Sequence, residues 1–116
     1  MNISRVVEEA TQPWIFETVV CSSIRESGEL LDKKDFAIVF CGERCADGTY
    51  RDLLSVARPR RVPVVVMISD GDQDFVFREA MTLGAFGVLA SPGSRQDVQW
   101  MVIRATHKGA GVRRSP

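Results

Sequence analysis

Short apolar segments and amphipathic segments alternate along the chain. Four apolar segments are rich in β-branched and aromatic residues and have no helical period, which is typical of strands buried on both faces of a parallel sheet. These segments are residues 15–21, 36–41, 62–69 and 87–90. The pattern therefore predicts a parallel sheet of about four strands.

Helical patterns fill the intervals, with apolar residues three or four positions apart. Capping boxes at Ser23 and Ser94 begin two helices, and Pro59 and Gly84 end two others. The predicted apolar faces are Ile24, Gly28 and Leu31; Leu53, Leu54 and Ala57 within 47–57; Val76, Ala80 and Leu83 within 73–83, flanked by Phe77 and Met81; Val98, Met101, Val102 and Ala105; and, in a short helix that Pro13 stops, Ile3, Val6, Val7 and Ala10.

Strict alternation of strand and helix predicts one α/β domain with right-handed crossovers. Its 116 residues, 45% hydrophobic and 26% charged, suit a single core. We expect this domain to occupy residues 1–107, with 108–116 as a flexible basic tail. Residues 69–74 include three aspartates, which we interpret as helix caps because calcium-loop spacing is absent.

Charge and hydropathy exclude several classes of function. The formal net charge is zero, so no overall field attracts nucleic acid or anionic lipid. No apolar run approaches the ~18 residues of a membrane span, and the N-terminus lacks the layout of a signal peptide. We therefore expect a cytoplasmic protein that binds neither nucleic acid nor membrane.

The cysteines do not form a recognisable metal or redox motif. Cys21 and Cys41 lie in apolar runs, where small buried side chains are expected, and Cys45 is not in C-x-x-C spacing with either. A zinc site would need more ligands than these cysteines and His107 supply. His107 also has no neighbouring acid or nucleophile, so we expect no catalytic role for it.

From about residue 15 to 105 the chain resembles the receiver domain of bacterial response regulators, the CheY-like superfamily. The resemblance is carried by GERCADGTYRDLL, VPVVVMIS and EAMTLGAFGVLASPGSRQDV. Receivers have D-L-R-L-P-D-G, a Thr or Ser ending the fourth strand, and A-x-x-x-G-A-x-x-Y-L-x-K-P. The matching positions here are Ser69, Ala80, Gly84, Ala85, Ser91 and Pro92. The resemblance implies a flavodoxin-like, three-layer α/β fold.

A working receiver binds Mg²⁺ and phosphorylates an aspartate at the end of its third strand. The resemblance places Gly42 at that acceptor position, or Phe40 in a second alignment. We prefer Gly42, because the other alignment would bury Arg51 and Asp52. Neither residue has a carboxylate. Glu43 is adjacent, but side chains alternate along a strand, so we expect it to point elsewhere.

Other parts of the receiver site are also changed. Ser91 stands where the family has a lysine, while Ser69 and Pro92 are retained, the latter with an expected cis peptide bond. Residues 15–21 correspond to the second strand of the family, so the first strand, with its acidic pair, has no counterpart here. Either the start codon is assigned too late or the truncation is real. We expect no Mg²⁺ site and no other cofactor.

These features predict a non-phosphorylatable, non-enzymatic receiver-like domain of a two-component or phosphorelay pathway. It would bind a signalling partner, or itself, through the face that the fourth helix, fifth strand and fifth helix form in the family. Trp100 belongs either to the core or to that face. The alternative is a flavodoxin-like ligand binder or enzyme whose crevice is lined by Ser69, Ser91 and residues 42–48.

Overall fold

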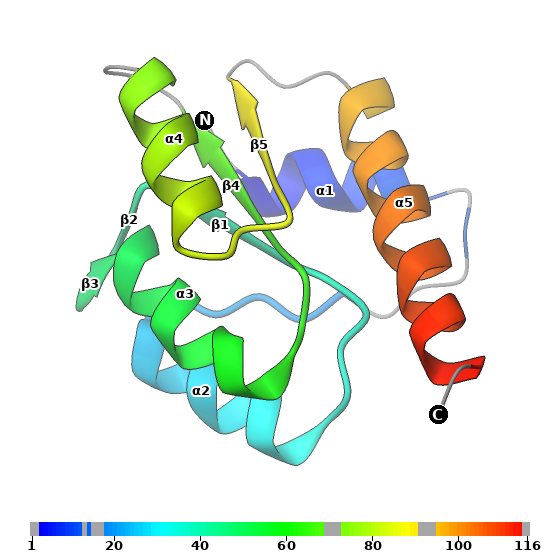
Figure 1. Cartoon of the computed structure of the whole chain (residues 1–116), viewed down its shortest axis with the longest axis horizontal. Helices are drawn as coiled ribbons and strands as arrows, with labels where there is room; N and C mark the ends of the chain where they lie inside the picture. The colour runs from blue at the N-terminus through cyan, green and yellow to red at the C-terminus, as the bar shows by residue number, and fades with distance from the viewer. Residues whose placement is uncertain (1–2, 13, 15–17, 69–72, 91–94, 115–116) are drawn as a thin grey trace.

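A computed structural model describes residues 3–12, 14, 18–68, 73–90 and 95–114, and the side chains of all of these except 3–4 and 107–114. Its sheet contains β1 (Val39–Gly42), β4 (Val64–Ile68) and β5 (Gly87–Ala90), all parallel, in the order β1-β4-β5 (Figure 1). The ladder pairs Val39 with Val64 and Val65 with Gly87. All five residues of β4 are buried, as expected for the middle strand of a sheet covered on both faces.

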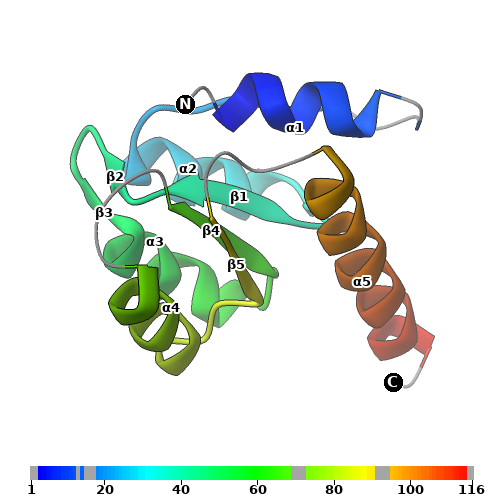
Figure 2. The ribbon, with the colours of Figure 1, turned by 90° about the horizontal axis from the view of Figure 1, so that it is seen from above.

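Helices cover both faces of the sheet. On one face α2 (Ile24–Lys33), α3 (Tyr50–Ala57) and α4 (Gln73–Thr82) pack, and on the other lie α1 (Ile3–Thr11) and α5 (Arg95–Arg114), as Figure 2 shows. A 3₁₀ turn at Arg58–Arg60, which contains Pro59, follows α3. The result is the three-layer α/β arrangement that the sequence predicts.

Each face of the sheet carries its own apolar cluster. The cluster under α2, α3 and α4 contains Cys41, Val64, Val66 and Ile68 from the sheet. The cluster under α1 and α5 contains Met67, with Phe40 and Leu89 packed against it. Because strand side chains alternate between faces, odd and even positions of β1 serve different clusters. The buried residues of the second cluster are Val7, Ala10, Met67, Val98 and Val102.

Local signals in the sequence set several helix ends. The Ser23 hydroxyl accepts a hydrogen bond from the Glu26 N–H at 3.0 Å and caps α2. Gly84 has φ +101° and ends α4, where the Ala85 N–H donates to the Ala80 carbonyl at 2.9 Å. Together with the Gly84 N–H bond to Met81 at 3.2 Å, this is a Schellman motif.

Three predictions about the elements need correction. Residues 18–21 form no strand, because they line a cavity beside β1 and pair with no strand of the described sheet; residues 15–17 of that prediction lie outside the described residues. Within the residues that the structure describes, the parallel sheet therefore has three strands instead of four. A hairpin of β2 (Arg44–Cys45) and β3 (Gly48–Thr49) replaces the expected first turn of the helix at 47–57, so α3 begins at Tyr50.

Other boundaries shift less. The strand expected at 36–41 is β1, displaced toward the C-terminus, and the one at 62–69 is β4. The backbone of α5 is helical through Gly109 and Gly111 to Arg114, where the sequence indicates fraying. The division into a domain of residues 1–107 and a tail of 108–116 stays a prediction. Pro13, Ser94 and two of the acidic-loop aspartates, Asp70 and Asp72, lie outside the described part of the chain.

Candidate functional site

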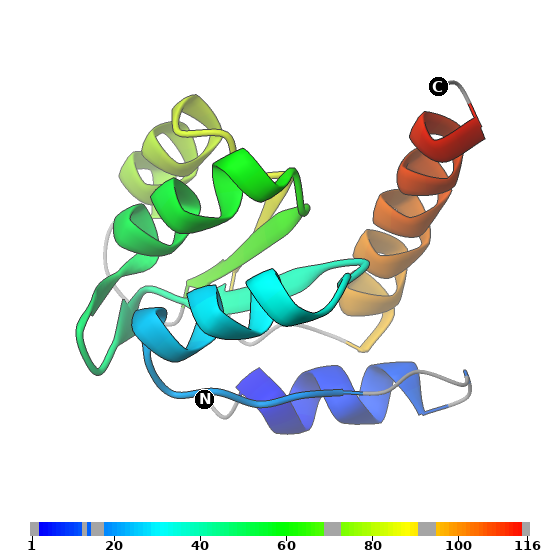
Figure 3. The same cartoon turned by 90° about the horizontal axis from the view of Figure 1, so that it is seen from below.

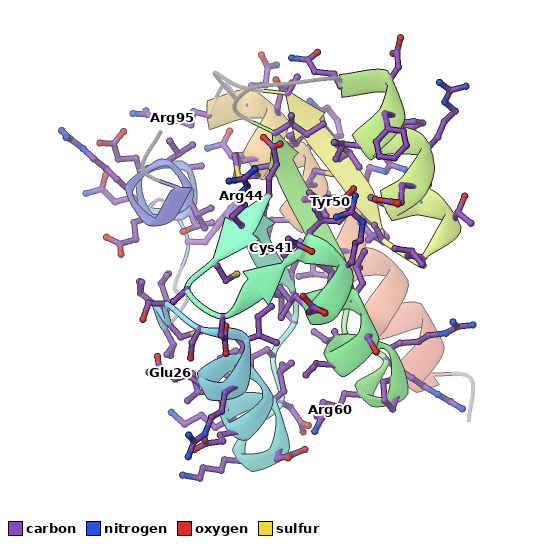
Figure 4. The ribbon with its side chains drawn as sticks, turned by 90° about the vertical axis from the view of Figure 1, so that its left-hand side faces the viewer. Glu26, Cys41, Arg44, Tyr50, Arg60 and Arg95 are labelled. Atoms are coloured by element: carbon purple, nitrogen blue, oxygen red, sulfur yellow. The ribbon has the colours of Figure 1, made fainter. Side chains whose placement is uncertain are left out.

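The site implied by the resemblance lies where the parallel strands end. Gly42 is the last residue of β1 and pairs in register with Met67 of β4. Figure 4 shows Arg44 and Arg95 toward this end of the molecule and Arg60 toward the other. Ser69, Ser91 and Pro92 lie outside the described residues, so their placement and the expected cis bond stay predictions.

Neither candidate acceptor position provides a nucleophile. Phe40 packs against the cluster beneath α1 and α5, and the backbone of Gly42 ends the strand. The burial pattern of α3 agrees with the reason for preferring Gly42: Leu53 and Leu54 are buried, while Arg51 is exposed. Likewise, Asp52 is exposed and Ala57 is buried. The alignment itself stays a prediction, as does the loss of the Mg²⁺ site.

Glu43 follows Gly42 and connects β1 to the start of α3. Its carbonyl accepts a hydrogen bond from the Tyr50 N–H at 3.1 Å. Burial of the Tyr50 hydroxyl, its bond to Glu79 and, more weakly, the Glu43 charge raise the pKa of Tyr50 to about 12, although the nearby Arg51 charge lowers it. The backbone of Glu43 thus has a structural task, and the expectation that its carboxylate has no metal or acceptor role stays a prediction.

Asp47 caps a helix that lies earlier in the chain. Its carboxylate accepts hydrogen bonds from the N–H groups of Ile24 (2.7 Å) and Arg25 (3.2 Å) at the start of α2. The bond from Ile24 is the main reason that the pKa of Asp47 lies below its ordinary value. Asp47, which lies within one of the stretches that carry the resemblance, therefore joins the hairpin to α2.

A polar cluster that the sequence did not indicate joins α3 to α4. The buried Tyr50 hydroxyl donates to Glu79 Oε1, and Arg51 Nε donates to the same oxygen at 2.6 Å. The Arg51 guanidinium also lies 5.0 Å from the centroid of the Tyr50 ring. These contacts lower the pKa of Glu79, with the Tyr50 bond as the largest cause. A hydroxyl with a raised pKa is a poor nucleophile, so the cluster acts as a link between helices.

All three cysteines line one cavity of about 630 Å³ beside β1. Burial raises the pKa of the Cys41 thiol to about 12, and burial is also the main reason that the pKa of Cys45 is raised. The Cys21 sulfur lies 2.9 Å from the Ser27 hydroxyl oxygen. Protonated thiols are weak metal ligands and nucleophiles. Within the described part of the chain, no group of three or more His, Cys, Asp or Glu side chains could hold a metal ion.

Two helices, α4 and α5, flank β5 (Figure 1). Both expose large apolar side chains. Trp100 on α5 is 57% exposed, so the interpretation of this residue as core is wrong. Phe77 and Met81 on α4, expected to flank the buried stripe, are 50% and 40% exposed. Met101, also on α5, packs inward against Gly87 of β5: a Cβ added to Gly87 would lie 2.6 Å from Cε of Met101. These side chains suit a protein-binding surface.

The described residues include no helix that is long and apolar enough to span a membrane. No family model matches the chain, and no curated protein matches it in sequence.

Solved structures are similar in fold. A response-regulator receiver domain from Clostridium thermocellum superposes with a TM-score of 0.82 at 19% identity, over 95% of this chain and 90% of that one. The receiver domain of NtrX from Brucella abortus gives 0.81 at 16% identity, over 91% of each chain. The receiver domain of a LuxO repressor protein from Vibrio parahaemolyticus gives a TM-score of 0.77 at 12% identity, over 93% of this chain and 87% of that one. The chain therefore has the CheY-like, flavodoxin-like fold of receiver domains.

Proposed function

We propose that this chain is a receiver-type signalling domain of a two-component or phosphorelay pathway that does not accept a phosphoryl group. The observation that carries the proposal is the end of β1: Phe40 is an apolar packing residue and Gly42 has no side chain. Phosphotransfer to a receiver needs a carboxylate nucleophile at this strand end. In addition, Ser91 stands where receivers have a lysine, whose charge would neutralise the phosphoryl oxygens.

Without phosphotransfer, the domain signals by binding another protein. Exposed Phe77 and Met81 on α4 and Trp100 on α5 give the two helices beside β5 an apolar surface of the kind that binds proteins. Arg104 lies 5.7 Å from the Phe86 ring centroid and attaches α5 to the start of β5. The partner is a signalling protein or a second copy of the chain, and the location is the cytoplasm.

The proposal is tested with labelled phosphodonors. The protein is incubated with Mg²⁺ and either acetyl phosphate or a phosphorylated histidine kinase, beside a working receiver as positive control. We expect acid-stable and acid-labile label on the chain to stay at background, both in the wild type and in Glu43→Gln, which removes the carboxylate next to β1. Stoichiometric acyl phosphate on the wild type would overturn the proposal, and its loss in Glu43→Gln would identify the acceptor.

A further inference from the structure

A groove opens where α3 meets the end of α4. On this face of the sheet α3 lies between α2 and α4, as Figures 1 and 3 show. The groove has a volume of about 460 Å³ and is lined by Arg51, Ser55, Arg58, Pro59 and Leu83. Small-molecule sites have volumes of roughly 300–1,000 Å³, so this space is large enough for a small ligand. We call it the α3–α4 groove.

The polar side chains of the groove come from one face of α3. Arg51, Ser55 and Arg58 follow one another at intervals of four and three residues, and the backbone of Arg58 is still helical, with φ −55° and ψ −50°. Side chains at these intervals are neighbours on a helix surface. Pro59 and Leu83 supply the apolar part of the lining, and both are exposed. The groove thus combines cationic, hydroxyl and apolar groups.

The groove carries a positive charge that no neighbour balances. Arg51 is paired, because its Nε donates to Glu79 Oε1 at 2.6 Å. The guanidinium of Arg58 forms no ion pair or hydrogen bond with another described residue. None of the residues that line the groove is acidic. An anion beside Arg58 would therefore meet an unpaired cation.

Hydrogen-bond donors for such an anion are also in place. The bond to Glu79 and the contact with the Tyr50 ring, 5.0 Å from its centroid, hold Arg51, while its Nη atoms donate to no described residue. The Ser55 hydroxyl likewise bonds to none of them. Guanidinium and hydroxyl groups donate to carboxylate and phosphate oxygens, and a guanidinium can form two parallel bonds to one such group.

A purely structural role fits Arg60 better than Arg58. Cations are favourable at the carboxyl end of a helix, and both arginines follow α3. Arg60 already fulfils this role, because its Nη1 donates to the Val56 carbonyl at 2.5 Å and its Nε to Asp32 at 2.8 Å. The side chain of Arg58 has no such task within the described part of the chain.

We infer that the α3–α4 groove binds a small organic anion, in which a phosphate or carboxylate group is joined to an apolar body. The anionic group bonds to Arg58, Ser55 and the Nη atoms of Arg51, and the apolar body packs on Pro59 and Leu83. This site is separate from the strand ends and from the apolar surface around β5, so it does not depend on the proposed function.

The probes are phenyl phosphate and benzoate, which distinguish the two anionic groups. NMR titration follows the amide signals of Ser55, Arg58 and Leu83, and we expect saturable shifts with at least one probe in the millimolar range or below. Inorganic phosphate and benzyl alcohol should bind more weakly, because each lacks one half of the ligand. Arg58→Gln should weaken binding about tenfold or more. The control Arg25→Gln removes the same charge from the exposed surface of α2 and should have no such effect.

Three outcomes would overturn the inference. The first is no saturable shift with either aromatic anion, which would leave Arg58 as a counter-charge to the end of α3. The second is equal weakening by Arg25→Gln, which would indicate a general effect of charge. The third is inorganic phosphate binding as tightly as phenyl phosphate. Unchanged amide signals of β4 and β5 in Arg58→Gln would show that the variant folds. None of these outcomes affects the phosphodonor experiment, so this inference and the proposed function fail separately.

Discussion

Met67→Ala tests whether α1 and α5 truly close the second face of the sheet. Met67 lies on the central strand, is 1% exposed, and contacts the cluster that includes Val7 and Val102. Truncating a buried methionine to alanine costs about 2–5 kcal/mol through lost burial and the remaining cavity. With β4 held on both sides by neighbouring strands, the site has little freedom to collapse, so we expect a loss of about 3 kcal/mol.

The assay is urea denaturation followed by circular dichroism. For a domain of this size the urea dependence is about 1–3 kcal/mol per molar, so the midpoint should fall by roughly 1–3 M with little change in slope. Met81→Ala is the matched control, because this side chain is 40% exposed, and it should change the free energy of unfolding by less than about 1 kcal/mol. A Met67→Ala loss no larger than that of the control would refute the packing of α1 and α5 on the sheet.

Three further predictions concern the polar contacts and the thiols. Asp47→Asn should lower the thermal midpoint. Because the folded-state pKa of Asp47 lies below its ordinary 3.8, its contribution is present above that pH and is lost as the pH falls through the folded-state pKa, so the midpoints of variant and wild type should converge in more acidic solution. Tyr50→Phe should cost about 1–2 kcal/mol in urea denaturation, since Glu79 loses a donor; an unchanged midpoint would contradict the link. Cys41 should resist alkylation at pH 7 in the native state, and rapid labelling in a mass-spectrometric time course would show that it is not buried.

The features that could be predicted from the sequence depend on neighbours close in the chain. Ser23 and Glu26 are three residues apart, and their hydrogen bond forms as expected. The end of α4 at Gly84 follows from the residue's freedom to adopt positive φ. Val98 and Val102 are buried as the apolar periodicity predicts, because they lie on the one helix face that covers the sheet.

The features that escaped prediction depend on partners far apart in the chain or on missing neighbours. Asp47 bonds to Ile24, 23 residues earlier, and Tyr50 bonds to Glu79, 29 residues later. No spacing rule connects such positions before the fold is known. Residues 18–21 have the composition of a strand but form no ladder with the described strands, and a sheet position exists only where a neighbour supplies hydrogen bonds. Trp100 shows the complementary case, since it is a large apolar residue that lies outside the buried stripe of its helix and is exposed.

The proposed loss of the phosphoryl and Mg²⁺ site is tested most directly by NMR titration with Mg²⁺ and beryllofluoride, a mimic of an acyl phosphate. We expect the amide signals of Gly42, Glu43 and the ends of β4 and β5 to stay unchanged up to millimolar concentrations, while a working receiver measured in parallel shifts. Saturable shifts confined to these strand ends would contradict the central claim, because they would show a functional acceptor and metal site in this chain.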